Sequence, residues 1–379
     1  MKVVIASDKF KGSLSSLEVA EAVGQGILSV LPACDVVGLP VADGGDGTAE
    51  ALVDALGGIW VEQIVLNPCH KRVVARYGVV GGDTVVMDVA SASGLALLGK
   101  DERNPLRTTS AGTGELIRDA IMSGYRKFMI GLGGSATNDG AMGILSALGY
   151  RFMDVRGCEL HPCGGNLSKV VKIDVTRVIP ELEECIFTLL CDVDAEFYGK
   201  KGAAYVFAPQ KGADSGGVKL LDEGLRSFAE VLFDNYGIDV RSLTYAGAAG
   251  GIGGGLGVVL GAEAVCGVEA VLQAVGFDEI VSGADFVVTG EGRMDRTTLL
   301  GKTPFGVCRA AHKHGVPVIA FAAEIADSAA LNDAGFLAVF PIVPGVVTKS
   351  NSMKAETASA NLRRTATQVF RLIDGLSLH

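Results

Sequence analysis

The segment from Val287 to Pro304, VVTGEGRMDRTTLLGKTP, combines two carboxylates and an arginine with a Gly-Lys-Thr triplet. Such a triplet ends the P-loop, whose amides and lysine bind phosphates. The P-loop pattern also requires a glycine five residues before the triplet, and Arg296 stands there. The segment is therefore not a P-loop, although Lys302 can still contact a phosphate.

The same segment places charged side chains on a glycine-rich loop directly after an apolar strand. Open α/β sheets bind ligands at the carboxyl ends of their strands. We expect Glu291 and Asp295 to hold a metal ion or to orient a substrate. Arg293 is a candidate for binding a carboxylate or a phosphoryl group.

Two loops near the start of the chain carry similar residue types. In SDKFKGS, Lys9 and Lys11 can bind a carboxylate or a phosphate. In VADGGDGT, Asp43 can ligate Mg²⁺ or act as a base, whereas Asp46 has the alternative role of capping the next helix.

The loop GLGGSATNDG supports two hypotheses. It matches Gly-x-Gly-x-x-Ala, and Asp154 lies 18 positions beyond Ala136, near the spacing of a dinucleotide-binding fold. This favours an NAD-dependent dehydrogenase as the rival function. The loop serves equally well as a phosphate cradle. The candidate ligands are Gly133, Gly134, Ser135 and Asn138.

Two later loops complete the set. In CDVD, Asp192 and Asp194 share one face of an extended segment, which fits Mg²⁺ binding plus a general base, or a turn held by aspartate. The stretch AGAAGGIGGGLG offers further amides for phosphates, at Gly251, Gly253 and Gly254.

Composition narrows the function classes. The net charge is −10 without a large basic cluster, which disfavours nucleic acid and anionic membranes as partners. None of the five histidines lies in these loops, which argues against Ser-His-Asp hydrolysis and a His-rich zinc site. No targeting segment is visible, so we expect a cytoplasmic protein. Acids, lysines and glycine amides together suit phosphoryl transfer.

The elements that position these loops alternate between strand and helix at both chain ends. Ser15 and Glu18 form a capping box for a helix near Ser16. Its expected buried stripe is Leu17, Ala20, Val23, Ile27 and Leu31. Such alternation predicts a parallel sheet covered on both faces.

The middle of the chain has a different pattern. WVEQIVL, RVVARYGVV and TVVMDVA alternate with period two, as antiparallel or mixed strands do. We predict a two-domain α/β protein. Residues 1–66 and 279–379 form a doubly wound, Rossmann-like or flavodoxin-like domain, and residues 67–278 form an inserted α/β domain with a mixed sheet.

Five motifs in one order resemble the type-1 glycerate kinase family: ASDKFKGSLSS, VADGGDGT, GGSATNDGAMG, CDVD with VFAPQKGA, and TGEGRMD with GKTP. The resemblance implies ATP-dependent phosphorylation of glycerate, mostly at the 2-hydroxyl. It also implies Mg²⁺ and a site in the cleft of a two-domain fold. Lys9 stands where the family has serine, and Ala195-Glu196-Phe197 where it has a sequence like Asn-Pro-Leu, so substrate choice is less constrained than reaction type.

Under this hypothesis Asp192 is the favoured base. Asp43, Asp194, Glu291 and Asp295 are the candidate metal ligands, and Lys302 joins the glycine loops at the nucleotide. Phosphorylation at the 3-hydroxyl, a related hydroxy acid as substrate, and a non-catalytic nucleotide-binding regulator are alternatives. The sequence leaves open whether the chain forms a homodimer.

Overall fold

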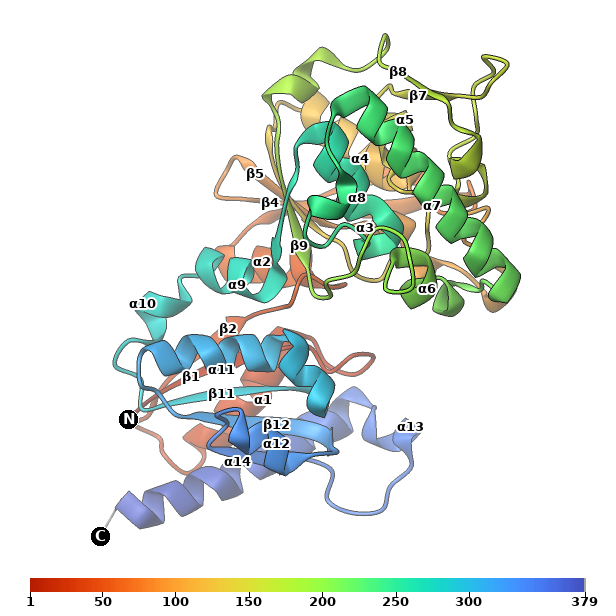
Figure 1. Cartoon of the computed structure of the whole chain (residues 1–379). Helices are drawn as coiled ribbons and strands as arrows, with labels where there is room; N and C mark the ends of the chain where they lie inside the picture. Colours follow the sequence, from red (N-terminus) through yellow and green to blue (C-terminus); the bar gives the residue numbers. More distant parts are fainter. Residues whose placement is uncertain (378–379) are drawn as a thin grey trace. The chain divides into compact units, whose positions relative to one another are not determined.

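The computed structural model describes residues 1–377 and divides into two compact units. The terminal unit comprises Met1–Asp43, Asp54–Leu56 and the chain from Val268 on. The inserted unit comprises Gly44–Val53 and Gly57–Gly267. Each unit has its own hydrophobic core. The predicted fold class is confirmed, because both chain ends build one unit and the middle of the chain builds the other (Figure 1).

The terminal unit contains one parallel sheet of five strands. They are β1 (Lys2–Ser7), β2 (Asp35–Pro40), β11 (Phe286–Met294), β12 (Val318–Ile325) and β13 (Ala338–Pro341). Their order is β13-β12-β11-β1-β2. The chain progresses in opposite directions from β1, to β2 on one side and to β11 on the other. The carboxyl ends of β1 and β11 therefore flank the topological switch point, where doubly wound sheets bind ligands.

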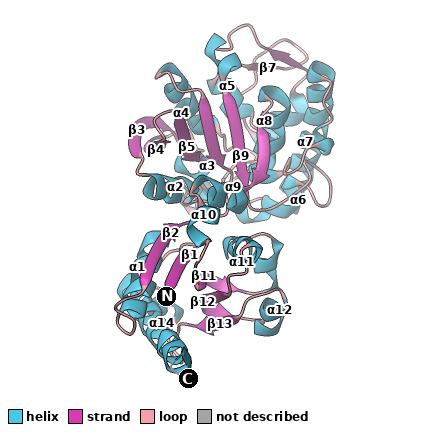
Figure 2. Cartoon of the chain, turned by 90° about the vertical axis from the view of Figure 1, so that its left-hand side faces the viewer, coloured by secondary structure: helices cyan, strands magenta, loops and turns pink. Residues whose placement is uncertain are grey.

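Helices cover both faces of this sheet (Figure 2). Helices α1 (Ser16–Leu28) and α14 (Ala355–Ser377) lie on one face, and α11 (Thr303–Lys313) and α12 (Ser328–Asp333) lie on the other. The remaining helices are α9 (Gly267–Ala274), α10 (Phe277–Val281), the 3₁₀ helix η7 (Arg296–Leu300) and α13 (Lys349–Ser352).

Helix α1 begins at the predicted capping box, in which Ser15 and Glu18 cap each other's backbone. One member of its predicted stripe is wrong, because Leu17 is 40% exposed. The buried face instead runs through Val19, Val23 and Ile27, which the helical period of 3.6 residues aligns. Glycine at 26 lets α14 approach closely, since a Cβ there would lie 2.5 Å from the Arg363 carbonyl oxygen.

The inserted unit contains a mixed sheet of six strands in the order β10-β9-β6-β5-β4-β3. The strands are β3 (Ile59–Leu66), β4 (Arg72–Val80), β5 (Thr84–Asp88), β6 (Lys127–Gly131), β9 (Ile186–Cys191) and β10 (Glu263–Cys266). β3, β4 and β5 pair antiparallel, as their alternation predicts, and β5, β6, β9 and β10 are parallel. Residues 57–66, expected in the other domain, belong here because β3 pairs with β4 along its whole length. Residues 44–53 also belong to the inserted unit, and residues 268–278 belong to the terminal unit, against the predicted boundaries.

Two short strands, β7 (Arg151–Met153) and β8 (Lys172–Asp174), pair separately. The helices of this unit are α2 (Thr48–Leu56), α3 (Val89–Ser93), α4 (Ala111–Met122), α5 (Met142–Ala147), α6 (Ala203–Phe207), α7 (Ser215–Tyr236) and α8 (Ala248–Leu260). α2 crosses from the inserted to the terminal unit at residue 54.

Candidate active site

Three carboxylates gather at the switch point of the terminal unit. Asp8 follows β1 directly, Asp43 follows β2, and Glu291 lies in the second half of β11. These strands are parallel neighbours, so their carboxyl ends share one edge of the sheet. Asp43 lies close enough to raise the pKa values of both Asp8 and Glu291.

Asp8 is half-buried and held by three contacts. Its carboxylate accepts hydrogen bonds from the Lys9 amide at 2.7 Å and the Thr303 hydroxyl at 3.1 Å. Its own amide donates to the carbonyl of Gly290 at 3.0 Å. Burial, followed by the charge of Asp43, raises the pKa of Asp8 to about 7. Asp8 can therefore exchange a proton near neutral pH.

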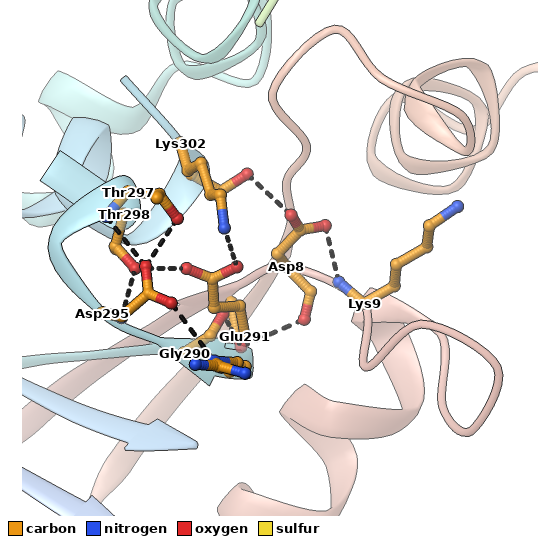
Figure 3. Close-up of polar contacts among 11 residues, drawn as sticks. Asp8, Lys9, Gly290, Glu291, Asp295, Thr297, Thr298 and Lys302 are labelled. Carbon is orange, nitrogen blue, oxygen red and sulfur yellow. Dashed lines mark hydrogen bonds and ion pairs between the residues drawn. The ribbon is translucent and has the colours of Figure 1, made fainter. Parts of the chain in front are cut away.

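Glu291 is held by Thr298 of η7 and by Lys302, the N-cap residue of α11 (Figure 3). The Thr298 hydroxyl donates to Oε1 at 2.7 Å, and the Lys302 ammonium lies 3.2 Å from Oε2. Burial raises the pKa of Glu291, while the contacts with Thr298 and Lys302 oppose that rise. At this edge of the sheet Lys302 forms an ion pair with Glu291, and its contact with a phosphate stays a prediction.

Asp295 and Arg293 are already engaged with neighbouring groups. Asp295 caps η7 by accepting from the amide of Thr297 at 2.8 Å and from its hydroxyl, which lowers the pKa of Asp295. Arg293 donates to Asp295 at 3.1 Å and lies 3.6 Å from Glu324. This geometry favours a structural role for Asp295.

The two lysines of the first loop differ in placement. Lys9 is half-buried, and its side chain extends away from the Asp8 carboxylate (Figure 3). Lys11 is exposed. From SDKFKGS we predicted these two lysines as site residues, but not Asp8. The missed signal was position, because Asp8 is the first residue after β1, one of the two strands that flank the switch point of the sheet.

In the inserted unit, the loop after β6 requires glycine at two positions. A Cβ at Gly133 would lie 2.4 Å from the Cα of Gly45, so any side chain would displace the loop. Gly134 has a φ of +74°, which is strained for other residues.

Several hydrogen-bond donors of this loop have no acceptor among residues 1–377. Within residues 1–377, the backbone N–H groups of Gly134, Ser135, Thr137 and Asn138 donate to no acceptor. The fully buried side-chain amide of Asn138 also has no partner among these residues. Buried polar groups in native proteins are nearly always paired, so unpaired donors on a glycine loop indicate a site for an anion.

Lys211 lies against this loop and was not selected from the sequence. Its ammonium donates to the Ser135 hydroxyl at 2.8 Å and to the Thr137 carbonyl at 2.7 Å. Only 2% of the side chain is exposed, and burial lowers the pKa of Lys211 to about 7, against the opposing charge of Asp139. The only signal was its place in the motif VFAPQKGA.

The CDVD aspartates lie at the end of β9. The amide of Tyr245 donates to Asp194 at 2.9 Å, which matches the structural alternative for that residue. Asp192 is half-buried. Both carboxylates lie near the Cys191 thiol, whose pKa is raised by burial and by their charge.

Asp46 does not cap α2, so that alternative is wrong. The helix is capped by Asp88 of β5, which accepts from the amides of Gly47 at 2.8 Å and Ala49 at 3.1 Å. Asp88 is remote from Gly47 in sequence, and only the fold reveals this contact.

The glycines of α8 are explained by close packing. A Cβ at Gly253 would lie 2.3 Å from the Tyr245 carbonyl oxygen, and one at Gly254 would lie 2.5 Å from Phe197. Gly251 has a φ of +89° at a kink in the helix. All three are buried, and close packing accounts for glycine at these positions, whereas phosphate binding by their amides stays a prediction.

No group of three or more His, Cys, Asp or Glu side chains within residues 1–377 could hold a metal ion by itself. Mg²⁺ usually keeps several waters and takes one or two carboxylates plus substrate phosphates. A complete protein cage is therefore not required for a magnesium-dependent transfer.

The dinucleotide-binding hypothesis fails on topology. In a Rossmann unit the acidic residue ends the strand beside the glycine-loop strand. Here Asp154 follows β7, which pairs with β8, whereas β6 pairs with β5 and β9. The Asp154 carboxylate instead accepts from the amides of Arg156 and Cys158 in a turn.

Comparison with known proteins identifies the family. A model of the glycerate kinase family matches residues 3–374. The chain belongs to the glycerate kinase family. The predicted resemblance and the predicted enzyme class, a kinase, are therefore confirmed.

Individual family members cover almost the whole chain. A glycerate kinase from Bacillus subtilis is 46% identical over 371 residues, 97% of each chain. A glycerate 2-kinase from Escherichia coli is 40% identical over 356 residues, 93% of each chain. The crystal structure of a Salmonella typhimurium protein assigned as glycerate kinase 2 matches with a TM-score of 0.88 at 40% identity and covers 100% of both chains. Among residues 1–377, no helix has the length and apolar character of a membrane span.

Proposed function

We propose that this member of the glycerate kinase family transfers the terminal phosphoryl group of ATP to the 2-hydroxyl of D-glycerate. The observation that carries the proposal is the group of Asp8, Asp43 and Glu291 at the switch point of the terminal sheet. Such a group can accept a proton and can bind a metal ion that contacts the phosphates. The 2-position is supported by the names of the relatives from Escherichia coli and Salmonella typhimurium.

Asp8 is the proposed general base. A base works best when its pKa lies near the working pH, and burial beside Asp43 brings Asp8 there. The hydrogen bond from Thr303 orients the carboxylate at Oδ2. Asp192, favoured from the sequence, remains the second candidate, and the two are separated by mutation.

Asp43 and Glu291 would hold Mg²⁺. The residues fit a hard divalent cation, because carboxylate oxygens are its preferred ligands and these like charges destabilise one another. The ion would neutralise charge on the phosphates as they transfer. Asp194 and Asp295 are less suitable ligands, since both already accept backbone hydrogen bonds.

The loop from Gly133 to Asn138 would bind the ATP phosphates. Its unpaired N–H groups and the Ser135 hydroxyl are neutral donors, which suit an anion. Lys9 and Lys11 would bind the glycerate carboxylate. Arg293 is a weaker candidate, because Asp295 and Glu324 already neutralise it.

The test is to incubate the purified protein with ATP, Mg²⁺ and D-glycerate and to record the proton-coupled ³¹P NMR spectrum of the product. A phosphate on C2 couples to one proton and gives a doublet, whereas a phosphate on C3 couples to two and gives a triplet. We expect the doublet.

A triplet would reject the 2-position and keep the kinase. Absence of any phosphoglycerate, with ATP intact, would reject glycerate as the substrate. A parallel incubation with GTP in place of ATP tests the nucleotide, and we expect slower transfer from GTP.

A further inference from the structure

The ammonium of Lys211 is buried without a carboxylate partner. Its two acceptors are the Ser135 hydroxyl and the Thr137 carbonyl; the charge of Asp139 acts on it, but no hydrogen bond or ion pair joins the two within residues 1–377. Removing such a cation from water is unfavourable, and an apolar side chain of similar volume would usually serve stability at least as well. Packing alone therefore does not explain a lysine at this position.

The contacts of Lys211 determine what Ser135 can do. A hydroxyl has one proton to donate and two lone pairs to accept with. Because Lys211 donates to Ser135 Oγ, the hydroxyl proton remains available, and the contact with Lys211 is the only side-chain hydrogen bond of Ser135 within residues 1–377. Ser135 is thus prepared to donate to an anion.

The second contact acts on the backbone. Lys211 holds the Thr137 carbonyl oxygen at 2.7 Å. In a trans peptide the carbonyl and the following N–H point in opposite directions. The N–H of Asn138 is therefore directed away from Lys211, and within residues 1–377 it donates to no acceptor.

We propose that Lys211 is the positioning residue of the phosphate-binding loop, holding Ser135 and the Thr137–Asn138 peptide so that they present donors to the phosphates of ATP. This inference rests on the proposed function, because it takes the loop after β6 as the nucleotide site. Lys211 acts through the loop, and its charge adds to the attraction for an anion.

The test compares Lys211→Met, Ser135→Ala and the double variant. Lys211→Met keeps the length and removes the donor, and Lys169→Met is the matched control, since Lys169 is exposed and bonds only to Asn166. Two quantities are measured: the Kd of Mg-ATP by calorimetry without glycerate, and the Tm.

We expect Lys211→Met to weaken ATP binding roughly 10- to 100-fold, as loss of charge-assisted contacts does. Its Tm should stay near the wild-type value, because relief of the buried charge offsets the lost hydrogen bonds. The Kd of the double variant should be only slightly higher than that of the single variant with the higher Kd. Lys211 and Ser135 belong to one chain of contacts, so breaking it at either residue has nearly the same effect as breaking it at both. Lys169→Met should change neither quantity.

A Lys211→Met variant with wild-type Kd would overturn the inference. So would additive losses in the double variant, or a lowered Tm with unchanged Kd, which is the mark of a purely structural residue. If the wild type binds ATP but transfers nothing to glycerate, the proposed function fails while the Kd values still decide the role of Lys211. If the wild type binds no ATP, both are rejected.

Discussion

The carboxylate group of the terminal sheet and the glycine loop after β6 in the inserted sheet carry opposite kinds of chemistry. The terminal sheet collects carboxylates, and Asp43 raises the pKa values of Asp8 and Glu291. The inserted sheet carries a loop of neutral donors backed by the buried cation of Lys211. One set is suited to protons and cations, and the other to an anion.

Under the proposed function, each loop would supply one of the two kinds of group that phosphoryl transfer needs. Phosphoryl transfer needs a place for negatively charged phosphates and a group that accepts a proton. Mutations can test whether the two roles are separable.

The largest expected effect is on the proton-accepting side. Asp8→Asn keeps the size of the side chain and removes its basicity. We expect kcat to fall by about 10²- to 10⁴-fold, with the KM for ATP changed by less than about threefold. Steady-state kinetics with varied ATP measure both parameters.

Asp35→Asn, an exposed position on β2, is the matched control for charge and should leave kcat unchanged. Asp192→Asn is assayed beside it. Should Asp192→Asn abolish turnover while Asp8→Asn retains it, the base belongs to the inserted unit and the proposed division is wrong.

The next effect is on the anion-binding side. In Gly133→Ala, the new methyl would collide with the backbone of Gly45, and the loop must move. We expect the KM for ATP to rise roughly 10- to 100-fold, with a smaller change in kcat.

Gly216→Ala, where a Cβ would lie 3.4 Å from Asp214, should be neutral. A Gly133→Ala enzyme with normal KM for ATP and raised KM for glycerate would instead assign this loop to the acid substrate.

A third prediction concerns pH and the terminal carboxylates. The pKa of Asp8 is raised to about 7 in the folded protein, against about 4 when unfolded. The folded state therefore binds more protons across that window, and its stability falls as pH rises from about 4 to 7. Asp8→Asn removes this penalty and should raise the Tm by roughly 2–4 °C at pH 8, and by less at pH 5.

Thermal melts in buffer containing EDTA measure this effect. An equal rise in Tm at both pH values would show that ionisation of Asp8 does not destabilise the folded protein. Asp35→Asn again serves as the control and should show no such difference.

The smallest expected effect separates packing from ligand binding in α8. In Gly254→Ala, the methyl meets Phe197 and Val240 at 2.5 and 2.6 Å. Overpacking costs about 1–3 kcal/mol, against about 1 kcal/mol gained in helix propensity. We expect the free energy of unfolding to fall by roughly 1 kcal/mol in urea melts, with no change in the KM for ATP. A raised KM for ATP without loss of stability would instead support Gly254 as a phosphate ligand.

Much of the fold was predictable because local patterns agree with it. The capping box at Ser15 and Glu18, the period-two strands and the strand–helix alternation each act within a few residues. Leu17 was wrongly assigned to the buried face of α1, because apolar residues occur on more than one side of this helix. The extent of the inserted unit was harder to predict, because only the pairing of β3 with β4 assigns residues 57–66.

The candidate site divides in the same way. Glu291, Lys302, Gly133 and Ser135 were predicted from residue type and loop position, and their roles stay predictions. Asp88, Asp8 and Lys211 were missed, and each gains its significance from a distant residue: Gly47, Asp43 and Ser135 respectively.

By itself the sequence determined the family, the two-domain α/β class and the loops that could carry chemistry. Those properties follow from residue types and short spacings, which can be read directly from the sequence. Only the tertiary structure decided which carboxylates lie close together, why glycine is required at positions of α8 and how Lys211 comes to contact the glycine loop. Burial and the approach of charges depend on chain segments that lie far apart in sequence, and folding alone brings them within a few ångströms.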